Sequence, residues 1–76
     1  MIKEELSILY DEFIKLARAK KYREEDIKML GLLALTKDSV RIFGNTEESF
    51  IYLIEITKEH KTSQEALDKF TTKLGF

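Results

Sequence analysis

The sequence predicts an all-α protein, an antiparallel up-and-down bundle of four helices. Three observations lead to this prediction. Apolar residues recur at intervals of three and four along most of the chain, as they do on one side of a helix. The 76 residues include no proline, which would interrupt a helix, and helix-capping residues separate the apolar segments. We expect residues 1–76 to form a single helical domain with a thin core.

The first predicted helix, residues 2–20, carries the clearest apolar stripe. Its stripe consists of Ile2, Leu6, Leu9, Phe13, Leu16 and Ala17. Glu4 and Glu5 lie in its first turn and basic residues in its last, which suits the helix dipole at both ends. Tyr10 and two isoleucines widen the apolar side. We therefore expect this helix to pack against more than one neighbour.

The second predicted helix begins near Arg23 and is apolar nearly all round over residues 27–35. A helix without a polar side is typically buried, so we expect it at the centre of the domain. Gly31 lies within it and indicates the close approach of a facing helix. The pattern allows the helix to end at Thr36 or to continue to Phe43.

Residues 50–56 read FIYLIEI, a composition that also favours a β-strand. The alternative fold is therefore α+β, with a hairpin at about residues 39–57 that turns at Gly44 and Asn45. We favour a helix because Asn45 and Glu48 have the spacing of a capping box. Acidic residues at the head of the segment and basic residues at its tail support the same choice.

The last predicted helix follows Thr62, which stands at capping-box spacing from Glu65. Its apolar stripe consists of Ala66, Leu67, Phe70 and Leu74. Gly75 is a typical residue after the end of a helix, and Phe76 would close back on the last turn.

The composition argues against most kinds of catalytic or metal site. The chain has no cysteine and one histidine, His60, which excludes a thiol nucleophile and a zinc site with two histidines. Three isolated glycines form no phosphate-binding loop. Glu55 and Glu59 share a helix side, and we interpret them as a solvated edge. We therefore predict no enzyme activity, no catalytic residue, no metal and no cofactor.

The charge distribution bounds the location and the partners. Thirteen basic and fourteen acidic residues give a net charge of −1, which provides no global attraction for nucleic acid. The longest apolar run, residues 29–35, is much shorter than the roughly 20 residues of a membrane span. Charged residues at positions 3–5 leave no room for a signal peptide, so we expect a cytoplasmic protein.

One segment concentrates positive charge and is the candidate partner-binding patch. It contains five cations, no acid and one tyrosine: Lys15, Arg18, Lys20, Lys21, Tyr22 and Arg23. One interpretation is a surface for phosphates or an acidic protein, with Tyr22 as a stacking or anchoring residue. The other is a helix end whose charge suits its dipole, followed by a solvated turn.

Four segments in this order resemble the immunity proteins that protect producers of pediocin-like bacteriocins. The segments read ELSILYDEFIKL, KKYREEDIKMLGLLAL, EESFIYLIEITKEH and TSQEALDKFTTKLG. The resemblance rests on helix order and apolar spacing, and the present chain is shorter and has no tail beyond the last helix. It implies a cytosolic, antiparallel four-helix bundle that binds and occludes a complex of receptor and bacteriocin.

The sequence therefore favours a small non-enzymatic protein-binding domain of the immunity or inhibitor kind, with an unidentified protein as its partner. Two alternatives stay open. One is a dimeric nucleic-acid-associated regulator that uses the basic patch at residues 15–23. The other is an oligomeric structural or phage-type assembly subunit, in which surplus apolar residues join copies of the chain.

Overall fold

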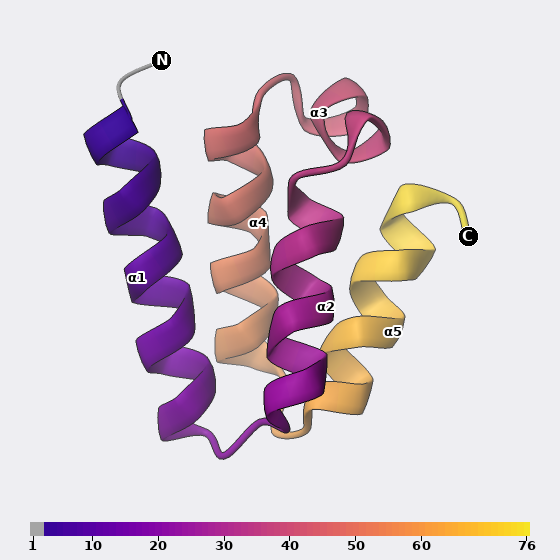
Figure 1. The fold of residues 1–76 in the computed structure, drawn as a ribbon. Coiled ribbons are helices and arrows are strands. Elements are labelled where there is room, and N and C mark those ends of the chain that lie inside the picture. The colour runs from indigo at the N-terminus through magenta and orange to yellow at the C-terminus, as the bar shows by residue number, and fades with distance from the viewer. Residues whose placement is uncertain (1–2) are drawn as a thin grey trace.

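The computed structural model describes residues 3–76, which form five helices (Figure 1). The helices are α1 (Lys3–Ala19), α2 (Glu24–Ala34), α3 (Lys37–Phe43), α4 (Thr46–Glu59) and α5 (Ser63–Leu74). No strand occurs in this range, so the all-α prediction is confirmed and the hairpin alternative over residues 39–57 is wrong. The predicted start of the first helix at Ile2 lies outside the described residues.

Side-chain caps start α4 and α5 at the predicted residues. The side chain of Asn45 accepts a hydrogen bond from the Glu48 amide at 2.8 Å, and that of Thr62 accepts one from the Glu65 amide at 3.2 Å. The Glu65 carboxylate accepts from the Thr62 hydroxyl at 2.9 Å, whereas a capping box would direct it to the Thr62 backbone amide. Caps of this kind typically contribute about 1 kcal/mol each.

Thr36 divides the segment whose end the sequence left open. Its hydroxyl donates to the Leu33 carbonyl at 2.7 Å and accepts from the Ser39 amide at 3.2 Å. The same hydroxyl thus closes the last turn of α2 and caps the first turn of α3. The described chain consequently has five helices where four were predicted.

The most extensive contact between two helices joins α1 to α4, which run in the same direction (Figure 1). Near the start of both helices, Glu5 and Glu47 line one hollow. Beyond the end of α1, Lys20 reaches the Thr57 carbonyl in the last turns of α4. The starts of α2 and α5 meet in the same way, because the Ser63 hydroxyl donates to Asp26 at 2.6 Å.

This packing differs from the predicted antiparallel up-and-down bundle, in which helices adjacent in the sequence are adjacent and antiparallel in space. The four long helices alternate in direction along the chain, but the two most extensive contacts among them, α1 with α4 and α2 with α5, join parallel helices. The apolar stripes determine which sides are buried, but several pairings bury the same stripes, and the sequence pattern does not distinguish them.

The centre of the core belongs to α4 rather than to α2. The largest fully buried apolar side chains are Phe13, Phe50, Phe70, Leu30 and Leu53, and two of the five come from α4. Within residues 3–76, α2 and α4 each contact all four other helices, but the contacts of α4 are the more extensive. Its strand-like composition therefore reflects burial, since β-branched and aromatic residues also suit a helix that is covered on several sides.

Candidate partner-binding surface

The outward side of α2 is exposed, which corrects the expectation that this helix is the buried centre. Ile27, Leu30, Gly31 and Ala34 face the core. Met29 is 48% exposed, Leu32 64% and Leu35, just after the helix, 52%. A helix that is apolar all round is thus covered on one side only.

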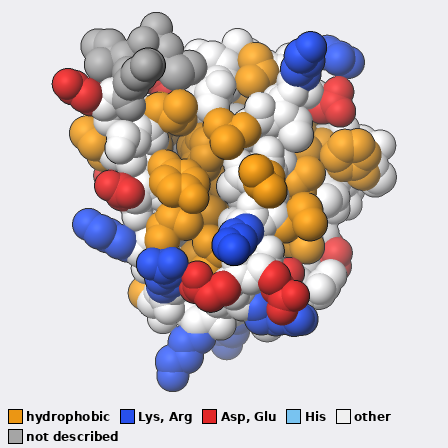
Figure 2. Space-filling view, in the orientation of Figure 1, with side chains coloured by type: hydrophobic (Ala, Val, Ile, Leu, Met, Phe, Trp, Pro, Cys, Tyr) orange, Lys and Arg blue, Asp and Glu red, His pale blue; other side chains and the backbone are white. Residues whose placement is uncertain are grey.

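Two adjoining hollows lie between α1 and α2 on this face. The larger, of about 300 Å³, is lined by Leu6, Ser7, Tyr10, Leu35 and Phe50. The smaller, of about 220 Å³, is lined by Tyr10, Lys28, Gly31, Leu32 and Leu35. Tyr10 and Leu35 border both hollows, which together form one groove that we call the α1–α2 groove. Figure 2 shows apolar side chains gathered over α1 and α2 on this face.

The Tyr10 ring lies between Phe50 of α4 and Gly31 of α2. The ring makes an edge contact with Phe50, at 5.9 Å between centroids and 78° between planes. A methyl group added at Gly31 would lie 3.5 Å from a ring carbon of Tyr10, at ordinary contact distance. The group that lies over Gly31 is therefore the Tyr10 ring, where the sequence suggested a facing helix.

Lys28 is the charged residue of the α1–α2 groove. Every other residue that lines the two hollows is uncharged. The Lys28 side chain is exposed, and within residues 3–76 it forms no ion pair within 4.0 Å. The groove thus combines apolar walls with one cation that is open to a ligand.

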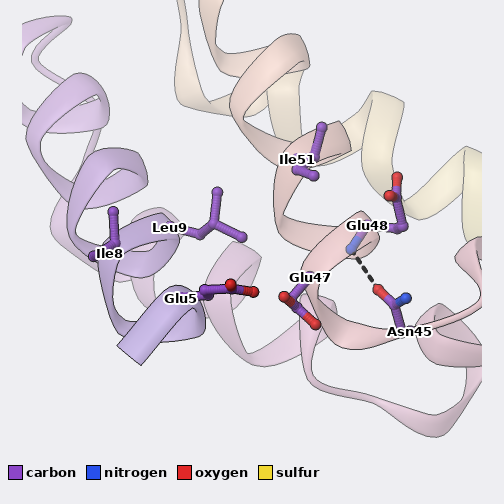
Figure 3. Close-up of a pocket in the computed structure, with 7 residues that line it drawn as sticks. All are labelled: Glu5, Ile8, Leu9, Asn45, Glu47, Glu48 and Ile51. Atoms are coloured by element: carbon purple, nitrogen blue, oxygen red, sulfur yellow. Dashed lines mark hydrogen bonds between the residues drawn. The ribbon is translucent and has the colours of Figure 1, made fainter. Parts of the chain in front are cut away.

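A second, more acidic hollow lies where the starts of α1 and α4 meet (Figure 3). The side chains of Glu5 and Glu47 point toward each other there, with Leu9 and Ile51 beside them. A hydrogen bond with Glu5 raises the pKa of the Glu47 carboxyl, and desolvation and the charge of Glu5 raise it further. Two neighbouring carboxylates therefore repel each other at neutral pH.

The described residues contain no group of three or more histidine, cysteine or acidic side chains that is arranged to hold a metal ion. Glu55, one of the pair considered from the sequence, lies 3.7 Å from the ammonium of Lys58. No helix within residues 3–76 is both long enough and apolar enough to cross a membrane.

The structure separates the six residues of the predicted basic patch. Arg18 forms an ion pair of 3.0 Å with Glu24, whose pKa this hydrogen bond lowers, and Arg23 pairs with Glu25. These pairs are exposed and contribute little to stability, but they partly neutralise the segment. Lys15 and Lys21 remain exposed side chains.

The other two patch residues are directed into the fold. Tyr22 is 5% exposed, and its hydroxyl donates to the carbonyl of Thr57 at 3.2 Å and to that of His60. Burial raises the pKa of Tyr22, which keeps the hydroxyl a donor. Lys20 donates to the same carbonyls. Tyr22 is therefore unavailable for stacking on a partner, because its ring is part of the core.

Sequence reasoning missed the residues of the α1–α2 groove. Tyr10 was assigned only to a broad apolar side of α1, and Leu32 and Leu35 to a buried helix. The signal that pointed to them was the absence of a polar side on α2, which is typical of a buried helix and also of a helix that awaits a partner.

A comparison of this chain with protein-family models, with curated proteins and with solved structures finds no match.

Proposed function

We propose that this protein is a binding domain that acts by holding another protein against the α1–α2 groove. The observation that carries the proposal is the exposure of Tyr10, Leu32 and Leu35 around one groove. Contiguous apolar surface that stays open to water is a common feature of interaction sites. Aromatic side chains in concave surfaces also supply much of the binding energy in protein interfaces.

The specific form of the proposal is an immunity or inhibitor protein, as the resemblance to the immunity proteins of pediocin-like bacteriocins suggests. In this form the groove binds a component of the bacteriocin target from the cytoplasmic side. Expression in a bacteriocin-sensitive host is expected to protect it, and Leu32→Asp is expected to remove the protection. Equal protection by Leu32→Asp would contradict the use of the groove, and no protection against any bacteriocin would contradict the immunity form.

The general proposal is tested by site-specific photo-crosslinking in the cells that produce the protein. A photoreactive residue in place of Leu32 is expected to give one discrete adduct, whose partner binds the purified protein in solution. The control replaces Gln64, an exposed residue of α5, and is expected to give no such adduct. Adducts of the same partner from both positions, or from neither, would contradict binding at the groove.

The contacts of the basic-patch residues favour protein binding at the groove over nucleic-acid binding through the patch. Two of the five cations are paired with acids and a third caps α4, so few remain to contact phosphates. Binding of DNA depends on several such contacts. A gel-shift titration at two salt concentrations is expected to show no specific, salt-sensitive complex.

A further inference from the structure

We infer that the ligand of the α1–α2 groove is an amphipathic helix that places an acidic side chain opposite Lys28. This inference rests on the proposed function and specifies the partner's chemistry. Three properties of the groove carry it: its length, its division into two hollows and its single charge.

The groove matches a helix in length. Its wall on α2 extends from Lys28 to Leu35, which is about two helical turns, or roughly 10 Å. A docked helix presents apolar side chains at positions i, i+4 and i+7 over the same distance. The two adjoining hollows, of about 300 and 220 Å³, each have room for an apolar side chain.

The walls also have the shape that this mode of binding uses. Tyr10 and Leu35 stand between the two hollows, and Phe50 of α4 forms part of the larger one. The edge contact with Phe50 restricts the Tyr10 ring, so less of the ridge between the hollows has to be ordered on binding. A preformed ridge lowers the entropy that a partner must overcome.

The charge of the groove selects among the possible occupants. A carboxylate on the docked helix would pair with Lys28, which feels the charge of Glu24 one turn away but forms no ion pair within 4.0 Å among residues 3–76. In a two-fold dimer that joins groove to groove, the second copy offers no such carboxylate, because the lining contains no acid. A two-fold axis through the groove would instead bring two Lys28 side chains together. A single cation among apolar walls is likewise a poor match for nucleic acid.

The test uses two synthetic peptides, helical and constrained, with leucine at positions i, i+4 and i+7. One carries glutamate beside the leucines and the other carries lysine at the same position. Titration into ¹⁵N-labelled protein is expected to shift the amide signals of Ser7, Tyr10, Gly31 and Leu35. The acidic peptide is expected to bind about fivefold more tightly than the basic one, as one partly exposed ion pair allows.

Substitution of the groove lysine separates charge pairing from apolar contact. Lys28→Glu is expected to reverse the preference between the two peptides, and Lys28→Gln to abolish it. The matched control, Lys69→Glu, changes an exposed lysine of α5 outside the groove and is expected to leave the preference unchanged. Both positions are exposed, so circular dichroism is expected to show an unaltered helix content.

Four results would overturn the inference. They are equal affinity for the two peptides, shifts confined to residues outside the groove, sedimentation equilibrium that shows a dimer broken by Leu32→Asp, and failure of both peptides to bind. The photo-crosslink from position 32 distinguishes this failure from that of the proposed function, because a non-helical partner would still give the adduct.

Discussion

The ammonium nitrogen of Lys20 lies 2.6 Å from the carbonyl oxygen of Thr57, to which it donates a hydrogen bond. It also donates to the carbonyls of Lys58 at 2.6 Å and of His60 at 3.1 Å. The last carbonyls of a helix have no partner within the helix, and a cation there also interacts favourably with the helix dipole. A residue that follows α1 thus caps the end of α4.

Removal of this cap is expected to destabilise the fold. Lys20→Met keeps most of the aliphatic chain but removes the donors, and we expect the free energy of unfolding to fall by about 1 kcal/mol. Lys15→Met is the matched control, because Lys15 is an exposed lysine of α1, and its effect is expected to be close to zero. Urea denaturation followed by circular dichroism measures both. Equal effects of the two variants would show that the contact with α4 contributes nothing.

The buried serines Ser39 and Ser49 are expected to respond unequally to replacement by alanine. The Ser49 hydroxyl donates to the Ala34 carbonyl at 2.9 Å, so the contact between the two hydroxyls needs the proton of Ser39. Ser49→Ala leaves the Ser39 hydroxyl and the Ala34 carbonyl without this partner, and we expect a loss of about 2 kcal/mol. Ser39→Ala leaves the bond to Ala34 intact and is expected to have about half the effect. The reverse order in thermal or urea denaturation would contradict this assignment of the donors.

The carboxylates of Glu5 and Glu47 are expected to make the fold less stable as the pH rises. The pKa of Glu47 is raised in the folded protein, so the folded state holds the proton more tightly than the unfolded chain does. The resulting stabilisation is complete below the ordinary glutamate pKa and is lost as the pH increases through the raised pKa.

Glu47→Gln is therefore expected to raise the urea midpoint at pH 7 relative to Glu48→Gln and to flatten its dependence on pH. Glu48 is the control because it shares the first turn of α4 and its dipole, and because its charge is the smallest of the causes that raise the pKa of Glu47. The midpoint is measured from pH 3 to pH 8. Identical pH profiles for the two variants would exclude the repulsion between Glu5 and Glu47.

Lys21 is the one residue other than glycine with a positive φ, of 62°, among residues 3–76. This left-handed conformation is unfavourable for residues with a side chain but not for glycine. Lys21→Gly is expected to increase the free energy of unfolding by about 0.5–1 kcal/mol. Lys61→Gly, in a loop with ordinary backbone geometry, is expected to decrease it because glycine makes the unfolded chain more flexible. A loss of stability in both variants would show that Lys21 is not strained.

Local signals predicted four of the five helical segments, although residues 39–57 also allowed a hairpin. Apolar spacing and the capping residues Asn45 and Thr62 placed α1, α4 and α5 close to their observed bounds. These features act within one or two turns, so the sequence contains them directly. The extra helix α3 depends on the Thr36 hydroxyl, which hydrogen-bonds to Leu33 in α2 and to Ser39 in α3. This double role of Thr36 was not evident from the spacing of residues alone.

The packing of the helices, and with it the candidate site, was decided only by the tertiary structure. The parallel contact of α1 with α4 directs Lys20 and Tyr22 into the fold, which disperses the basic patch that the sequence predicted. The same packing leaves one side of α2 uncovered and forms the groove beside Tyr10. The sequence alone determined which side chains prefer burial. Which of them remain exposed is a property of long-range pairing, because one apolar side can be buried against several alternative neighbours.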